Sequence, residues 1–252
     1  MNKFFYFLCF ALVLLFSACG EDDDSRLTDN FDRATMLTGW ADNIIVPGYT
    51  EFRDKSSALA TQATLFNNDP SEENFGALQN RWLEAYRAWQ YVAMFEIGKA
   101  ESVLLLNQIN IYPTDTEAID NNLQGAEYNL ELPSAIDQQG FPALDYLLFG
   151  LEDNEAAIYQ RYTDASTGVA HRDYLLTVAT RIENLAIQVL TDWTGNYRDA
   201  FVANAGNDAN ASVDRLVNDF LFHYEKHLRA GKVGIPAGIF SADKQPDLVE
   251  AR

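Results

Sequence analysis

Basic residues are scarce in this sequence. There are 18 Lys and Arg against 37 Asp and Glu, which gives a formal net charge of -19. Nucleic-acid binding depends on a positive patch that neutralises phosphates, and no cluster of basic residues occurs along the chain. The composition therefore argues against nucleic acid as a partner. An acidic surface suits cations or basic partners but does not choose between them.

Cysteine and histidine are also scarce, with 2 Cys and 3 His in 252 residues. Cys9 lies inside the apolar N-terminal stretch and Cys19 at its end, so removal of that stretch leaves no pair for a disulfide. No GxxxxGK[ST] sequence occurs, which argues against a phosphate-binding loop. No Ser or Cys nucleophile has an evident His and Asp partner.

Residues 1–18 resemble a bacterial lipoprotein signal peptide. Lys3 supplies a positive start, and Phe4–Phe16 is an apolar run too short for a comfortable membrane span. Small residues precede Cys19, so cleavage there leaves Cys19 as the lipid-modified N-terminus, and several acyl chains make a stable membrane anchor. An ordinary cleaved secretory signal is the alternative interpretation.

Residues 19–30 are predicted to be an acidic tether. The run Glu21–Asp24 follows Cys19 almost at once, and such runs are usually solvated. It also resembles acidic export signals that place lipoproteins on the outer face of the outer membrane. We therefore predict a cell-envelope location, as an outer-membrane lipoprotein that is surface-exposed if the run is an export signal.

Beyond residue 30, apolar residues recur at helical spacing and no alternating strand pattern is evident, which predicts an all-α fold. We expect a helical bundle over residues 31–163 and a second bundle over residues 164–252. Pro47, followed by a glycine, is expected to kink or split the first helix. A later helix carries an apolar and aromatic stripe expected in the core: Phe75, Leu78, Trp82, Tyr86, Trp89 and Val92.

The second half contains two clear amphipathic helices, the second of them starting at Ser212 and stopping at Gly231. Two such helices cannot bury both apolar faces alone, so we expect this bundle to be incomplete without helices from the first half or further chain. The positions predicted to be buried are Leu175, Val178, Ile182, Leu185, Val189 and Trp193 in the first helix, and Val213, Leu216, Phe220, Tyr224 and Leu228 in the second.

The main candidate for chemistry lies in a short helix bracketed by Gly140 and Gly150. Pro142 fits the first turn of a helix, where its missing N–H costs nothing. Asp145 directly follows Leu144 on the apolar face, so it is expected near the core, where a carboxylate must be paired, hydrogen-bonded or metal-bound. A structural hydrogen bond to Arg, Tyr or a backbone N–H is the alternative to a binding role.

His223 and His227 lie one helical turn apart, a spacing that allows two histidines to bind one metal ion. Glu225 lies between them, so the segment is not an HExxH motif. Ordinary surface or domain-interface histidines are the alternative. His171 is isolated near a helix start and is expected to be solvated.

Residues 140–150 resemble the signature of the imelysin-like family, also called the M75 peptidase-like proteins. That signature is Gly-x-His-x-x-Glu, followed by an apolar run and a glycine. The resemblance covers roughly residues 31–240, and in the family the chain continues beyond the last matching loop. Further similarities follow the family's order: Val46-Pro47 with Tyr49, Trp82 with Arg87 and Glu96, Asn110–Pro113, and Lys232–Gly238.

The resemblance implies two four-helix bundles in a secreted or lipid-anchored bacterial protein. Pro142 occupies the family's histidine position and Asp145 its glutamate position. Because proline neither ligates a metal nor transfers a proton, and a zinc peptidase needs about three protein ligands and a general base, peptidase activity is not expected.

We therefore predict a non-catalytic envelope lipoprotein. Relatives of the family include components of iron uptake, so the resemblance implies a part in iron or haem acquisition. On this interpretation Asp145 lies near a groove between the bundles and binds iron, another divalent metal or an envelope protein partner. The alternatives are a zinc metallopeptidase that uses Asp145, His223 and His227, and a structural surface lipoprotein without a ligand.

Overall fold

The computed structural model describes residues 30–125, 127–242 and 245, so the predicted signal peptide, Cys19 and nearly all of the acidic tether lie outside the described part. The chain divides into two compact units after Asp32, and the helices described here belong to the unit that starts at Arg33. The described residues contain helices and no strand, which confirms the all-α prediction. None of these helices is both long and apolar enough to cross a bilayer.

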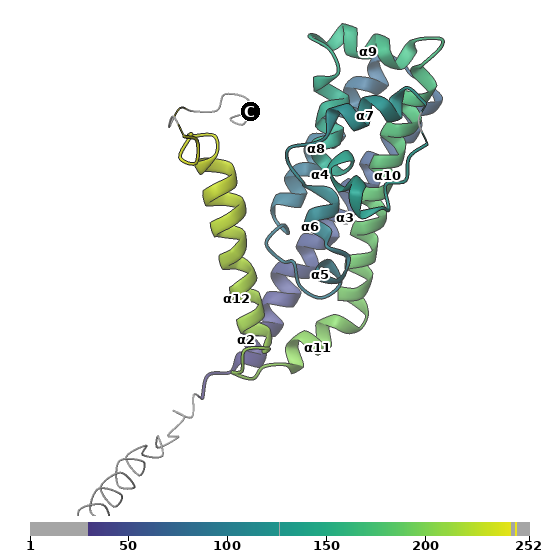
Figure 1. Ribbon diagram of the computed structural model, residues 1–252. Helices are drawn as coiled ribbons and strands as arrows, with labels where there is room; N and C mark the ends of the chain where they lie inside the picture. The colour runs from purple at the N-terminus through teal and green to yellow at the C-terminus, as the bar shows by residue number, and fades with distance from the viewer. Residues whose placement is uncertain (1–29, 126, 243–244, 246–252) are drawn as a thin grey trace, which may run out of the picture. The chain divides into compact units, whose positions relative to one another are not determined.

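The elements follow one another along the chain with short connections (Figure 1). The η elements are π-helical except η2, which is a 3-10 helix. In order they are α2 (Arg33–Trp40), η1 (Ala41–Ile45), α3 (Val46–Asn68), α4 (Glu72–Gln90), α5 (Lys99–Val103), α6 (Leu105–Ile109), α7 (Thr116–Leu123), η2 (Pro133–Gln138), α8 (Gly140–Asp145), η3 (Tyr146–Gly150), α9 (Glu155–Thr163), α10 (Gly168–Asp192), η4 (Trp193–Tyr197), α11 (Arg198–Ala203), α12 (Ser212–Phe222) and η5 (His223–Gly234).

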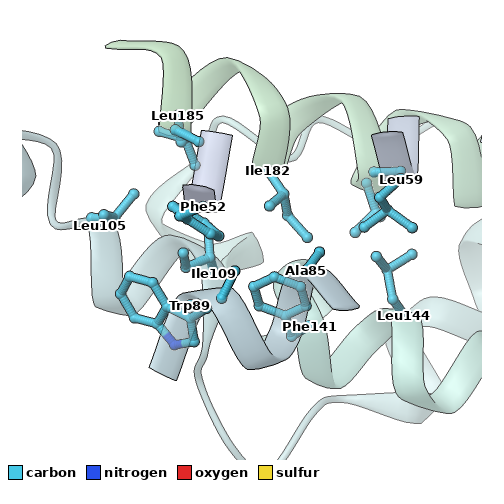
Figure 2. Close-up of a cluster of buried hydrophobic side chains, with 14 of the residues drawn as sticks. Phe52, Leu59, Ala85, Trp89, Leu105, Ile109, Phe141, Leu144, Ile182 and Leu185 are labelled. Atoms are coloured by element: carbon cyan, nitrogen blue, oxygen red, sulfur yellow. The ribbon is translucent and has the colours of Figure 1, made fainter. Parts of the chain in front are cut away.

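The core forms where α3, α4 and α10 run side by side, with α8 and α6 closing it (Figures 1 and 2). The aromatic rings pack at tilted angles, with 5.5 Å between the centroids of Phe52 and Trp89. Four positions of the predicted stripe are buried, while Trp82 and Tyr86 are only partly buried. The side chains at the centre are Phe52, Leu59, Ala85, Trp89, Leu105, Ile109, Phe141, Leu144, Ile182 and Leu185.

The expected break at Pro47 takes the form of a π-helical turn. The chain stays helical from α2 through η1 into α3, with Pro47 at the second position of α3. A π turn leaves backbone groups of the preceding turn without their usual partners, which accommodates the missing N–H of proline without ending the helix. Gly48 matters here because a Cβ atom on it would lie 2.9 Å from a methyl carbon of Val92.

The hydrophobic core continues across the expected domain boundary at residues 163–164. That boundary coincides with the turn between α9 and α10, but α10 packs along α3 and contributes Val178, Ile182 and Leu185 to the same core. We therefore assign α10 to the core of α3 and α4, which differs from the expected division of the chain. The sequence could not decide this, because an apolar face does not specify which helix covers it.

The C-terminal segment formed by α12 and η5 (yellow in Figure 1) is helical as predicted, but most of its predicted core face is exposed. Leu216 is 7% exposed, whereas Phe220, Tyr224 and Leu228 are 44%, 47% and 41% exposed. The prediction that these three side chains are buried is therefore wrong for the described structure. They recur at helical spacing, but no element within residues 30–125 and 127–242 covers them.

Candidate functional site

The motif helix α8 depends on Gly140 for its position. Gly140 has a φ of +80°, and a Cβ atom there would lie 2.4 Å from the carbonyl oxygen of Ile109. Both the left-handed backbone and the close approach of α6 exclude a side chain. Gly150 differs, since its φ is not positive and a Cβ atom would meet only the Tyr146 ring, at 2.9 Å. The first glycine of the motif therefore has a structural role.

Pro142 lies in the first turn of α8 and is half-buried. Its ring supplies neither a proton nor a metal ligand, so the position that resembles the family's histidine is chemically inert. Phe141 and Leu144 on the same helix are buried in the core. The inward face of α8 therefore packs in the core. The titratable side chain of this helix, Asp145, lies on the outward face.

Asp145 lies on that outward face and is solvent-exposed, which differs from the expectation that it lies at the edge of the apolar face, close to the core. Among the described residues no side chain or backbone N–H bonds its carboxylate. Neighbouring protein atoms still remove part of its water, and this desolvation raises the pKa of Asp145 above its usual value. An unpaired, partly desolvated carboxylate gains from binding a cation.

An aromatic surface flanks the motif on α4. Trp82 stacks on Tyr86 with 5.4 Å between ring centroids and an interplanar angle of 13°, and it meets the edge of Phe149 at 5.4 Å. Its indole N–H donates to the carbonyl of Phe141 at 3.2 Å. Phe149 follows Asp145 by four residues, so the carboxylate and this ring share one side of the helix.

The C-terminal segment reaches the same aromatic surface through Lys232. The Lys232 ammonium donates to the Tyr86 hydroxyl at 3.1 Å and lies 5.8 Å from the centre of that ring. Tyr86 also packs on Phe141, with 5.2 Å between the ring centroids. Two segments that resemble the family, residues 140–150 and 232–238, thus meet at Tyr86. This contact was not predicted, because the helical spacing of Tyr86 with the apolar stripe indicated a core position.

The three candidate metal ligands are not brought together. Within the described ranges no group of three or more His, Cys, Asp or Glu side chains could hold one ion. His223 and His227 pair with each other on η5, with 5.5 Å between ring centroids, and burial lowers the pKa of both. The metal site predicted from Asp145, His223 and His227 together is therefore wrong for this structure.

His171, expected to be solvated, is buried with 4% of its surface exposed. Its Nδ1 lies 2.9 Å from the carbonyl oxygen of Thr167, and its ring meets the edge of Tyr162. Because its ring nitrogen has a hydrogen-bond partner and its ring packs on Tyr162, His171 has a structural role.

Two acidic side chains that the sequence did not identify as a pair meet between the bundle and α12. Asp219 Oδ2 accepts the backbone N–H of Glu96 at 2.6 Å, and the Glu96 carboxylate accepts the N–H of Leu106 at 3.2 Å. Burial raises the pKa of Glu96 to about 7 and that of Asp219 to about 6, and repulsion by nearby carboxylates, Glu101 among them, adds to both shifts. Residues from distant parts of the sequence form this contact, so spacing could not reveal it.

Comparison with solved structures shows where this architecture occurs. The chain is similar to an imelysin-like protein from Psychrobacter arcticum 273-4, with a TM-score of 0.61 and 19% identity over 81% of this chain and 64% of that one. It is also similar to a protein from Parabacteroides distasonis ATCC 8503 named as an iron-regulated protein A precursor, with a TM-score of 0.62 and 16% identity over 83% and 61%. At these identities the likeness shows a shared fold.

The chain spans less than two thirds of the length of either solved structure, with 64% and 61% of them covered. No curated protein matches it. The family model described as Imelysin, of the M75 peptidase type, matches residues 45–252, which include the motif helix, the aromatic surface and the C-terminal segment. The chain therefore belongs to the imelysin family.

Proposed function

We propose that this protein is a non-catalytic, envelope-anchored imelysin that takes part in iron or haem acquisition through the outward face of α8. The observation that carries the proposal is the unpaired Asp145 carboxylate, which precedes Phe149 of the aromatic surface by four residues on the same side of the helix. An exposed, partly desolvated carboxylate favours a bound cation, and oxygen ligands suit hard metal ions.

The non-catalytic part of the proposal rests on Pro142. Metal-assisted hydrolysis needs protein ligands, an open coordination position and a base for the water. Pro142 supplies none of these at the position that resembles the family's histidine. Asp145 alone can bind a cation but cannot provide both a ligand set and a separate general base.

The surroundings of Asp145 also suit a flat aromatic ligand. Phe149 is 45% exposed, so a planar macrocycle could lie against an aromatic edge there. Tyr86 and Lys232 at the far side offer a phenol oxygen, which is a known type of haem ligand, and a cation for a propionate. One structural neighbour is named as an iron-regulated protein A precursor, which supports iron as the common theme.

The proposal also includes attachment of the protein to the membrane through lipid on Cys19. Residues 1–18 would direct export, and lipid on Cys19 would anchor the protein to the outer membrane, with Glu21–Asp24 favouring surface exposure. Metabolic labelling with a fatty acid tests this step: Cys19→Ala is expected to abolish label incorporation. Protease treatment of intact cells then separates surface exposure from the inner leaflet.

The two alternatives lose their specific support. A zinc metallopeptidase would need Asp145, His223 and His227 around one ion, and the described residues hold no such group. A purely structural lipoprotein would bond Asp145 to Arg or to backbone N–H groups, and its carboxylate has neither among the described residues. Neither alternative explains the exposed aromatic edge beside the carboxylate.

The test is a titration of the soluble chain from Gly20 onward with ferric ion, ferrous ion, zinc and haemin, followed by calorimetry and, for haemin, by its absorption spectrum. We expect binding of iron or haemin at about micromolar concentration that falls at least about tenfold in Asp145→Asn. Asp153→Asn, another exposed acid, is the matched control.

Each of the other possible results of this titration contradicts a different part of the proposed function. Equal binding by wild type and Asp145→Asn would remove the site from α8, and no binding of any of the four ligands would remove the iron function. Zinc binding lost in both Asp145→Asn and His223→Ala, with cleavage of a casein substrate, would restore the peptidase.

A further inference from the structure

A groove of about 730 Å³ lies on the side of α10 that faces residues 128–131. Its residues differ from those of the Asp145 surface. Thr177, Arg181, Asn184 and Gln188 form one stripe along α10, at the spacing of a helix face. Leu130, Leu185 and Ile187 supply apolar walls. The groove thus combines a row of hydrogen-bond donors with hydrocarbon surface.

Arg181 is fixed in this groove by two glutamine side chains. Its Nε donates to Oε1 of Gln139, and its Nη2 donates to Oε1 of Gln108 at 2.8 Å. Gln139 is fully buried and donates to the Leu130 carbonyl at 2.9 Å and to Gln108 Oε1 at 3.2 Å. These amides orient the guanidinium but leave its charge uncompensated, because their oxygens carry only partial charge.

Nη1 is the edge of Arg181 that the amides leave open. In the described part of the chain the carboxylate that pairs with Nη1 is that of Glu131, whose Oε1 lies 4.0 Å away. The Glu131 side chain is 82% exposed, whereas that of Arg181 is 20% exposed. Burial lowers the pKa of Arg181, and the charge of Glu131 offsets only part of this effect. A half-buried cation without a close counterion is unusual in a chain with a net charge of -19.

We propose that this groove binds an organic carboxylate, whose oxygens pair with Nη1 of Arg181 and whose carbon body lies against Leu130, Leu185 and Ile187. The guanidinium fork matches the geometry of a carboxylate. Thr180 and Asn184 also line the groove, and their side chains carry hydrogen-bond donors. A dianion such as phosphate is a poorer fit, because Glu131 and the acidic surface repel a second negative charge.

Glu131 acts as an internal competitor in this arrangement. Its carboxylate stands at the rim, close enough to attract Nη1 but too far for a hydrogen bond. A ligand carboxylate must displace it and overcome its repulsion. Removal of this charge is therefore expected to tighten binding, an effect opposite to that of most substitutions in a binding site.

The test uses 2-naphthoate as the probe and the uncharged 2-naphthamide as its matched control, with the chain from Gly20 onward and fluorescence titration at pH 7. We expect 2-naphthoate to bind with a dissociation constant of about 1 mM or lower, and 2-naphthamide at least about tenfold more weakly. Glu131→Gln is expected to tighten 2-naphthoate binding by roughly two- to fivefold.

Arg181→Gln is expected to abolish the preference for the carboxylate, and Arg181→Lys to weaken binding by losing the fork. Arg161→Gln, an exposed arginine paired with Glu152, controls for the loss of a positive charge elsewhere. Because Arg181→Gln removes bonds to buried amides and could unfold the chain, the probe preference of the wild type and the Glu131→Gln effect test the site independently.

Equal affinity for the two probes, no binding of 2-naphthoate up to about 10 mM, or unchanged affinity in Glu131→Gln would each overturn the proposal. Asp145→Asn is expected to leave 2-naphthoate binding unchanged. The outcome is therefore separate from that of the iron titration.

Discussion

Two amphipathic helical segments of this molecule have the same kind of sequence pattern and opposite surroundings. In α10, Leu175, Val178 and Ile182 are at most 1% exposed, and this side of the helix packs against its neighbours, which include α3, α8 and α9. In the C-terminal segment of α12 and η5, Leu216 is buried at 7% exposure while Phe220 and Leu228 remain 44% and 41% exposed. The pattern alone predicted both faces to be buried.

Different kinds of contact hold the two segments in place. α10 packs against α3 mainly through apolar side chains of the shared core, with a hydrogen bond from Asn67 of α3 to Asp173 of α10. The C-terminal segment packs on the core through Leu216 and Val213 near its start. Its other contacts with the bundle include three polar ones: Asp219 accepts the Glu96 N–H, Arg215 pairs with Glu101, and Lys232 donates to Tyr86. Hydrophobic burial dominates folding energy, so α10 belongs to the stable body and the C-terminal segment is expected to respond to pH and charge.

The largest predicted effect compares the same substitution in the two segments. Leu175→Ala removes a fully buried side chain and is expected to lower the free energy of unfolding by about 2–5 kcal/mol. Leu228→Ala removes a side chain that is 41% exposed and is expected to cost about 1 kcal/mol or less. Urea unfolding of both variants, followed by circular dichroism, measures the difference.

Leucine to alanine changes helix propensity little, so the pair isolates burial. Equal losses in the two variants would mean that Leu228 is covered in solution, and the contrast between the segments would then be lost.

The fold class could be predicted because helical periodicity is a local property of the sequence. The spacing of Leu175, Val178 and Ile182 records which side of α10 is apolar, and the structure buries that side. The same reasoning failed at Phe220, because periodicity states which face is apolar and not whether another element covers it. Burial is a property of the whole fold.

The site was predictable only in part. Gly140, Pro142 and Asp145 lie in one short helix as expected from the sequence, yet Asp145 is exposed because the helix turns that side outward. The contact of Asp219 with the Glu96 N–H spans 123 residues, and no local pattern encodes it. Arg181 was missed for a related reason: the buried amides that orient it come from other elements.

The next prediction concerns the pH dependence of the contact between the C-terminal segment and the bundle. Burial raises the pKa of Glu96 to about 7 and that of Asp219 to about 6, above their ordinary values of 4.5 and 3.8. The folded state therefore holds these protons more tightly than the unfolded chain, and the associated stability is present below about pH 4 and lost as pH rises through 6 to 7. We expect a loss of about 1–3 kcal/mol over this range.

Glu96→Gln and Asp219→Asn keep the accepting oxygens but cannot ionise, so each is expected to flatten the pH dependence of unfolding between pH 4.5 and 7.5. Asp153→Asn serves as the exposed control. A pH profile that stays the same in Glu96→Gln would show that the contact does not titrate in this range.

A smaller effect on stability is expected from the contact between the C-terminal segment and Tyr86. Lys232→Met removes the ammonium that donates to the Tyr86 hydroxyl and lies over the ring, at an expected cost of about 0.5–1 kcal/mol. Hydrogen exchange provides the measurement, with faster exchange expected in η5 and unchanged exchange in α10. Lys226→Met is the control, because Lys226 lies over Phe222 of its own segment and not over the bundle. Equally fast exchange in both variants would mean that the contact with Tyr86 has no specific effect.

The smallest predicted effect on stability completes the comparison. Phe220→Ser replaces an exposed aromatic side chain and is expected to change the free energy of unfolding by less than about 0.5 kcal/mol. Phe201→Ser, at a residue 2% exposed, is expected to be severely destabilising because it puts a polar group into the core and leaves a cavity. Thermal unfolding distinguishes the two variants. A large loss in Phe220→Ser would mean that this face is covered in solution, since an exposed ring has little free energy to lose.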